Sequence, residues 1–417
     1  MKKLIIIMIF SLLCITNCLS NPISTLQQSE ENILPEYVFQ NSIPVEILPP
    51  DYIYSYGTTI KLPEFIYVAS SHHENGIFSP CYWQGTNNIT VLPIPAGVRF
   101  FSVSAITKGN GIIYAAGGYE SNNGWRPCYW KNTERIDLPI NEGANGVVNA
   151  ILVDDGVVYT LGTLWYGMRG RVEQDCYWQE TTKIDLPDTV RVRSFTIKNE
   201  VIFTAGSYKD ENNMWKPCYL QGTNIIDLSI PNGASGSVSS ITIANETVYT
   251  VGSYNESGIS KPCYWQGMDR FALSFPEGSI CYMNSIIVNN GIVFIAGSYI
   301  SDRVWRGIET NTNNHFGNNN YYISSNYLNN EFVYPVFSPV PSRWMACYWQ
   351  DEKRIDLDYF VGISSPLCSI VVSNGTVYNT AFIGSGNAKG IYWENNIQYN
   401  LDIYGYGIQI SAVFIDK

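Results

Sequence analysis

The chain has 417 residues, of which 45% are hydrophobic, 14% are aromatic and only 15% are charged. These fractions exclude an intrinsically disordered protein and favour β-structure, in which aromatic residues are enriched. The formal net charge is −11 and Lys and Arg do not cluster. We therefore expect no nucleic-acid partner, because a phosphate-binding surface needs clustered basic side chains.

The first residues have the features of an export signal. Two lysines from Lys2 onward precede an apolar run over 4–15, which is too short to span a bilayer but suits a signal peptide. The tetrapeptide ITNC, ending at Cys18, resembles a relaxed bacterial lipobox, so 1–17 is predicted to be a lipoprotein signal peptide and Cys18 the lipidated residue. The alternative is ordinary cleavage after Ser20. Either way, we expect export to the cell envelope or outer surface.

Residues 18–60 follow as a different kind of segment. They are rich in Pro, Ser, Gln and Glu and show no persistent helical or strand period. We expect a tether here, carried by the lipid anchor. The remaining residues, 61–417, are predicted to form one repeated domain.

The triplet Cys-Tyr-Trp recurs through this domain. Its third position is spaced by 47, 48, 42, 45, 84 and 44 residues, and the longest step is one period plus an insertion. A period near 45 is typical of the blades of a β-propeller. The triplet begins at Cys81, Cys128, Cys176, Cys263 and Cys347, with the variants CYL from Cys218 and IYW from Ile391.

Short turn sequences stand in phase with the triplet, each between two apolar runs. Asn-Gly and Asp-Gly accept positive φ at low cost, so such pairs close tight hairpins. Each unit therefore contains four short strands: a before the turn, b after it, c with the triplet, and d ending near Ile-Asp-Leu-Pro. The turn pairs begin at Asn110, Asp155, Asn199, Asn245, Asn290 and Asn374.

The two ends of the domain are complementary. Residues 64–71 align with a strand b, whereas the last residues, SAVFIDK, align with a strand a that reaches its turn. Joining them completes one blade and removes an exposed sheet edge. The predicted fold is all-β, a seven-bladed β-propeller of four-stranded antiparallel blades, with the ring closed by the C-terminal strand joining the first blade.

The order of signals in each unit resembles the kelch repeat over residues 64–417. The signals come in this order: a Gly-containing turn, an apolar pair with Tyr, a Trp and then Leu-Pro. The departure is at the double glycine after strand b, which only Gly117-Gly118 provides. The resemblance implies a β-propeller.

The repeated Cys and Trp are predicted to be core residues. Alternate side chains of a strand face opposite ways, and both faces of a blade pack on neighbouring blades. Facing sheets lie about 10 Å apart, whereas the Cα atoms of a disulfide lie within about 7 Å, so equivalent cysteines should not pair. Small residues precede each turn by five positions, which suggests close packing at the axis or, alternatively, a serine-lined channel: Ala105, Ala150, Ser194, Ser240, Ser285 and Ser369.

No catalytic signature appears. Nucleophile elbows and phosphate-binding loops are missing, and the three histidines are His72, His73 and His315, with the first two expected in the b–c loop of blade one. We expect no catalytic residues, no cofactor and no metal, and predict that the chain is not an enzyme. Carboxylates brought together from distant positions stay an open alternative.

An insertion over about 300–343 separates strands b and c of blade six and is rich in Asn and Tyr. Long loops are usually functional or disordered, and the alternative is a tolerated surface expansion. Because b–c and d–a loops share one face of a propeller, this face is the predicted ligand face, together with Arg99, Arg191 and Arg193. Its aromatic candidates are Trp125, Trp215, Trp305, Trp344, Tyr321, Tyr322 and Tyr327.

The sequence thus predicts an exported, lipid-anchored, monomeric propeller that acts as a binding module for an unknown protein or glycan. Two alternatives remain at this point. One is an envelope hydrolase or lyase that uses carboxylates at the channel mouth, and the other is a periplasmic scaffold protein.

Overall fold

The computed structural model describes residues 59–60, 66–74, 77–84, 88–167, 172–276, 279–300, 344–357, 369–373, 375–383, 389–401 and 410–415. The regular elements in these segments are β-strands, and none of the segments forms a helix able to cross a bilayer. The predicted insertion and the predicted signal peptide lie outside the described residues.

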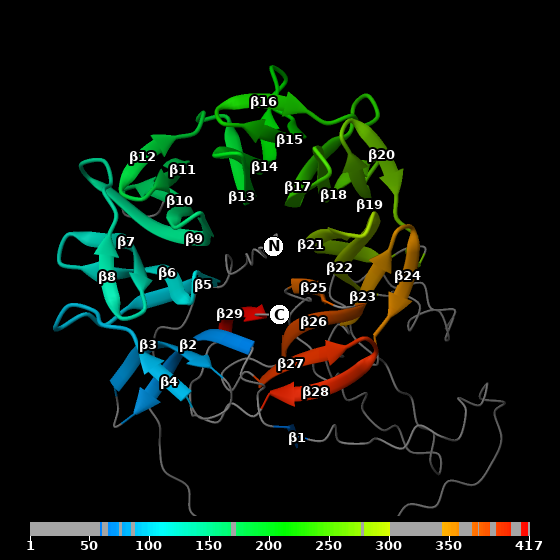
Figure 1. The fold of residues 1–417 in the computed structure, drawn as a ribbon. Helices are drawn as coiled ribbons and strands as arrows, with labels where there is room; N and C mark the ends of the chain where they lie inside the picture. The colour runs from blue at the N-terminus through cyan, green and yellow to red at the C-terminus, as the bar shows by residue number, and fades with distance from the viewer. Residues whose placement is uncertain are drawn as a thin grey trace, which may run out of the picture.

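Seven sheets surround a central axis as the blades of a propeller, each with antiparallel strands a to d from the axis outward, which confirms the predicted fold (Figure 1). Blade one contains β29 (Ile410–Ile415), β2 (Ile66–Glu74), β3 (Ile77–Gln84) and β4 (Asn88–Val91). Blade two contains β5 (Phe101–Gly109), β6 (Ile112–Ser121), β7 (Gly124–Lys131) and β8 (Glu134–Asp137). Blade three contains β9 (Ala144–Asp154), β10 (Val157–Tyr166), β11 (Val172–Gln179) and β12 (Thr182–Asp185).

The other four blades repeat this order. Blade four contains β13 (Val190–Lys198), β14 (Val201–Lys209), β15 (Trp215–Gln221) and β16 (Asn224–Asp227). Blade five contains β17 (Ser235–Ala244), β18 (Thr247–Glu256), β19 (Ile259–Gln266) and β20 (Asp269–Ala272). Blade six contains β21 (Ile280–Asn289), β22 (Ile292–Ile300), β23 (Trp344–Gln350) and β24 (Lys353–Asp356). Blade seven contains β25 (Ser369–Ser373), β26 (Thr376–Ile383), β27 (Lys389–Glu394) and β28 (Ile397–Leu401).

The ring closes as the sequence predicts. Strand β29 pairs antiparallel with β2, so that Val413 lies opposite Val68, and the first and last strands of the repeated domain complete blade one together (Figure 1). A further short strand, β1 (Thr59–Ile60), runs parallel to the outermost strand of blade seven, β28. It lies at the end of the segment predicted to be a tether.

The a–b turns have the backbone conformation that their sequences predict. Asn110 and Gly111 have φ values of 50° and 80°, and Asn199 and Glu200 have values of 49° and 64°. Positive φ at both central residues is the mark of the tight hairpin turn whose twist matches the flanking strands. Blades four and five therefore place a glutamate where blades two and three have the more permissive glycine.

The repeated Trp side chains form the contacts between blades. All six are buried, and in blades two, three, five and six the indole N–H donates to a carbonyl in the connection that leaves the preceding blade, as Trp130 does to Pro93 at 2.8 Å and Trp265 to Ser229 at 3.0 Å. Packing between blades, together with this hydrogen bond where it forms, thus explains why Trp recurs at this position. Five of these side chains have no exposed surface: Trp130, Trp178, Trp265, Trp349 and Trp393.

The cysteines of the repeat are packing residues, as predicted. Burial raises the pKa of the Cys81 thiol to about 12, which keeps it protonated. Cys368 lies outside the described residues. The cysteines that the structure describes are all free and buried: Cys81, Cys128, Cys176, Cys218, Cys263, Cys281 and Cys347.

The small residues near the axis also pack, and they do not line a channel. Each of the six is buried. The hydroxyl oxygen of Ser194 accepts a hydrogen bond from the backbone N–H of Ile241 at 3.3 Å, and Ser240 does the same for Ile286 at 3.4 Å. These bonds join strand a of one blade to strand a of the next, so the close-packing interpretation is confirmed.

A β-bulge recurs in strand a of blades two to six, one residue before the small residue. The pairing of β13 with β14 shifts between Val192 and Ser194, which leaves Arg193 as the extra residue. The bulge brings a carbonyl so close to the glycine opposite that a Cβ on Gly206 would lie 1.9 Å from the Arg191 carbonyl oxygen. A glycine is therefore required there. In the described blades two to six the extra residue is polar: Ser104, Asn149, Arg193, Ser239 and Asn284.

Candidate ligand-binding site

The predicted ligand face is the one on which each strand b ends and each strand c begins. Trp125 is the second residue of β7 and Trp215 the first residue of β15, and both side chains are half-buried there. Trp344 begins β23, although its side chain is not among those described. The other four aromatic candidates, Trp305, Tyr321, Tyr322 and Tyr327, lie outside the described residues.

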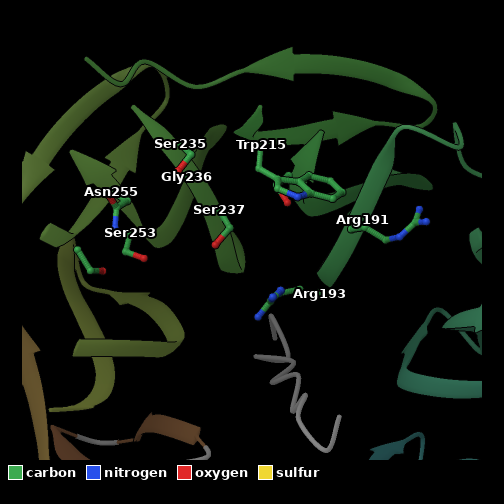
Figure 2. A pocket seen from close by; sticks show the side chains of 10 residues that line it. Arg191, Arg193, Trp215, Ser235, Gly236, Ser237, Ser253 and Asn255 are labelled. Atoms are coloured by element: carbon green, nitrogen blue, oxygen red, sulfur yellow. The ribbon is translucent and has the colours of Figure 1, made fainter. Parts of the chain in front are cut away.

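A hollow of about 420 Å³ opens on this face between blades four and five, and we call it the open groove (Figure 2). It brings together Trp215, Arg191 and Arg193, three residues that the sequence assigns to the ligand face. Trp125 and Arg99 do not line it. Five hydroxyl groups and one amide complete the wall, with Gly236 between them: Ser207, Ser235, Ser237, Ser253, Ser260 and Asn255.

Trp215 is fixed by basic side chains of its own blade. Lys209 lies opposite it across the β14–β15 pair, and the ammonium group is 5.2 Å from the centre of the indole ring. This is a cation–π contact. The next residue, Lys216, donates to the backbone oxygen of Ala234 at 2.8 Å, which ties the start of β15 to the wall of blade five.

The two arginines point in different directions. The guanidinium group of Arg191 donates to the backbone oxygens of Glu173 at 2.6 Å and Val190 at 2.7 Å, and it is directed away from the hollow (Figure 2). Arg193 is the exposed residue at the bulge within β13, and its side chain points in a different direction from that of Arg191 (Figure 2).

Arg193 is crowded although solvent reaches it. Desolvation lowers the pKa of its guanidinium, and the charge of Asp175 opposes that shift. An arginine keeps its proton under any such shift, so Arg193 is a cation at the groove.

Asp175 is the buried carboxylate behind this part of the groove, and only 4% of it is exposed. Its two oxygens accept hydrogen bonds from the Val192 backbone N–H at 2.8 Å and from the Thr163 hydroxyl at 2.7 Å. Burial raises the pKa of Asp175, while both hydrogen bonds and the charge of Arg191 act in the opposite direction. The carboxylate thus joins blade three to the bulge that carries Arg193.

The position of Asp175 is an exception within the repeat. The residue before the triplet is proline in blades one, two, four and five, and it is Ala346 in blade six and Gly390 in blade seven. Blade three alone has a charged residue, Asp175, and the bulge that it contacts in blade four carries the arginine. Comparing the repeats position by position is the signal that could reveal both residues from the sequence.

The histidines do not contribute a site in the described residues. His72 and His73 lie in β2, opposite Ser79 and Phe78, and not in the b–c loop as predicted. Wherever the structure describes the chain, no three His, Cys, Asp or Glu side chains gather as possible metal ligands. His315 lies outside the described residues.

No protein-family model and no curated protein matches the sequence. Solved structures do match. The chain is similar to the β-propeller domain of the Trilobed protease from Pyrococcus furiosus, with 9% identity over 72% of this chain and 82% of that chain and a TM-score of 0.37. It is also similar to the fucose-recognising lectin of Aleuria aurantia, with 7% identity over 73% and 93% and a TM-score of 0.35.

A third similar structure is the sialidase of Trypanosoma rangeli, with 9% identity over 79% of this chain and 56% of that chain and a TM-score of 0.37. At such identities and scores, these similarities transfer no ligand, partner or activity to this chain. The propeller fold is established by the pairing of its own strands.

The prediction that the chain is not an enzyme was drawn from missing motifs, and it is wrong because missing motifs do not support that conclusion. Two of the similar propellers belong to enzymes, a sialidase and a protease, and neither enzyme class can be read from the fold. The fold and the missing motifs therefore do not decide whether this chain catalyses a reaction.

Proposed function

We propose that the protein is a binding module that takes a protein or glycan ligand on the face where b–c and d–a loops meet. The observation that carries the proposal is the open groove, in which one half-buried Trp, one exposed Arg and a polar wall converge. Recognition sites commonly combine an aromatic anchor with a few convergent polar groups in a hollow of this size.

The rest of the proposal concerns where the module acts. We propose export, with Cys18 as the lipidated residue and membrane anchor, a monomeric state, and a distant kinship to kelch repeats. The lipobox-like tetrapeptide and the order of signals in each repeat support these parts. Replacing Cys18 with Ser should release the protein from the membrane fraction, and unchanged membrane association would contradict the anchor.

The test of the binding site uses two equivalent tryptophans. The full chain is screened for binding to arrays of glycans and extracellular proteins, alongside the variants Trp215→Ala and Trp125→Ala. We expect Trp215→Ala to weaken binding of the captured ligand at least about tenfold, as for a hot-spot aromatic residue. Trp125→Ala should change it less than about twofold. Equal binding by the wild type and Trp215→Ala would exclude the open groove as the site.

A further inference from the structure

Most of the side chains that line the open groove are short and polar. Six of its ten described lining residues are serines or Asn255, and they come from four strands of blades four and five (Figure 2). A serine hydroxyl both donates and accepts hydrogen bonds, and so does a side-chain amide. The hydroxyl groups of a sugar have the same double capacity. Among the described lining residues there is no aliphatic side chain, so hydrogen bonding dominates this wall.

Such a lining differs from that of a protein–protein interface. Serine is depleted in those interfaces and is under-represented among the residues that dominate their binding energy. A stable protein partner also needs a broad contact of about 800 Å² on each side, whereas this hollow has about 420 Å³, the size of a small-molecule site. The groove therefore suits a small polyhydroxyl group better than a protein surface.

Trp215 gives the groove its apolar part. Its half-buried indole lines the hollow, and the Lys209 ammonium group, 5.2 Å from the ring centre, helps to hold it in place. A pyranose ring has C–H groups on its face and hydroxyl groups at its rim. It can thus pack on the indole while its rim meets the serines. The hollow has room for one or two such rings.

The two arginines of the groove both interact with other groups of the chain. The Arg191 guanidinium donates to the backbone oxygens of Glu173 and Val190, and the Glu173 carboxylate lies 3.9 Å from its Nε. Arg193 has its own interactions within the protein, among them one with the charge of Asp175. Each arginine therefore has a carboxylate of the protein nearby, and the hydroxyl groups and the indole are the features that select a ligand.

We infer that the ligand of the open groove is an uncharged saccharide, one ring of which packs on Trp215 while its hydroxyl groups bind the serines and Asn255. The inference rests on the proposed function, because it names the ligand class of the same site. Recognition by hydroxyl groups and an indole forms no ion pair with the ligand. The affinity should therefore depend little on ionic strength.

The repeat supplies matched substitutions for the test. Val147 of blade three stands at the position of Ser237, so the fold accommodates valine there, and Ser237→Val removes one hydroxyl of the wall with little risk to folding. Ser102 has the same position in blade two, away from the open groove, so Ser102→Val is the control. The probes are uncharged oligosaccharides of glucose, galactose, mannose and N-acetylglucosamine, acidic fragments of hyaluronan and heparin, and an array of extracellular proteins.

Isothermal titration of the full chain with the best-bound uncharged oligosaccharide measures the affinity. We expect a loss of at least about tenfold with Trp215→Ala and of at least about threefold with Ser237→Val, which removes one hydrogen bond. Ser102→Val should change the affinity less than about twofold. Between about 50 mM and about 500 mM salt, the affinity of the wild type should likewise change less than about twofold.

The other outcomes separate this inference from the proposed function. If only acidic glycans bind, or if affinity falls steeply with salt, and Trp215→Ala weakens binding, the groove is a binding site but the uncharged class is wrong. If only proteins are captured and Trp215→Ala weakens their capture, the saccharide class is wrong. Equal losses for Ser237→Val and Ser102→Val would overturn the role of the serine wall. If no probe binds, or if Trp215→Ala leaves every captured ligand unaffected, both proposals fail.

Discussion

The interface between blades two and three occupies the same place in the repeat as the open groove between blades four and five, but its side chains differ. We call it the bridged interface, because a hydrogen bond of Asn145 in blade three connects it to blade two. The Asn145 side-chain oxygen accepts a hydrogen bond from the backbone N–H of Trp125 at 2.8 Å. Ser235 takes the place of Asn145 in the open groove.

The two interfaces differ at three more aligned positions. Val147, Trp165 and Glu173 of blade three correspond to Ser237, Asn255 and Ser260 of the open groove. The backbone beneath is the same, since Gly162 and Gly252 stand opposite the same bulge. The two interfaces thus share a backbone, and a few shorter and more polar side chains give one of them a hollow where the other has a hydrogen bond across it. Repeat folds acquire individual sites by such substitutions.

The largest expected effect tests whether the interface between blades two and three and the interface between blades four and five are equally well packed. Trp178 packs against blade two and Trp265 against blade four, both fully buried and hydrogen-bonded to the neighbouring blade. We expect Trp178→Ala and Trp265→Ala each to lower the free energy of unfolding by ~3–5 kcal/mol, because each opens a large cavity. Urea denaturation followed by intrinsic fluorescence measures both.

The half-buried Trp215 is the control for the loss of an indole as such. Trp215→Ala should cost well under ~2 kcal/mol, because part of that ring already contacts water. A small loss of stability for Trp265→Ala and a large loss for Trp178→Ala would show that the two interfaces are not equally well packed. The open groove would then be part of a loosely packed interface and not a hollow built on a firm one.

Much of this fold can be predicted from the sequence because the repeat encodes it several times. The triplet fixes one strand per blade, and the turn pairs fix a hairpin, as at Asn110-Gly111. Complementary ends such as 64–71 and SAVFIDK imply the closed ring. Each signal depends only on local sequence and on a period near 45, so no long-range geometry is needed.

The site is harder to predict because it depends on which side chains face one another across a blade interface. The sequence assigns Trp215, Arg191 and Arg193 to the ligand face, but gives no sign that the Arg191 guanidinium turns away. The serine wall escapes notice, since serines such as Ser237 are common in such strands. Asp175 in a proline position is detectable, but its contact with the Val192 N–H follows only from the bulge.

An intermediate effect is expected at Asp175, which joins blade three to blade four. It accepts from Thr163, which corresponds to Ser253 of the open groove, and from the Val192 N–H beside Arg193. Asp175→Ala should lower the free energy of unfolding by ~1–3 kcal/mol, because it leaves a buried N–H without its acceptor. Chemical denaturation measures this loss.

The pH dependence of the same residue sharpens the comparison. Because burial raises the folded-state pKa of Asp175 above its ordinary value, the folded protein holds this proton more tightly than the unfolded chain. The contribution to stability is then full below the ordinary pKa of about 4 and falls as pH rises through the raised value. Asparagine cannot ionise, so the free energy of unfolding of Asp175→Asn should rise relative to that of the wild type between pH 4 and pH 7. Asp188 is exposed in the connection between β12 and β13, so Asp188→Asn controls for net charge. A gap that widens in favour of the wild type would contradict the assignment.

The smallest expected effect concerns the a–b turns, where blades two and three have glycine and blade four has Glu200. A residue other than glycine in the left-handed region costs ~1 kcal/mol, of which the extra freedom of glycine in the unfolded chain cancels a part. Glu200 has a φ of 64°, so Glu200→Gly should raise the free energy of unfolding by ~0.5 kcal/mol. Gly111→Glu, at a φ of 80°, should lower it by a similar amount.

Removal of a negative charge is the alternative explanation for any gain in stability from Glu200→Gly. The pKa of Asp154 is raised by burial first and then by the charges of Asp155 and Glu200, so removing Glu200 also relieves a repulsion. Glu200→Gln removes the charge and keeps the strained backbone. If Glu200→Gln and Glu200→Gly shift the urea midpoint equally, repulsion accounts for the effect. A further gain with glycine assigns it to the backbone, and blade four then folds its turn at a conformational cost that blades two and three do not have.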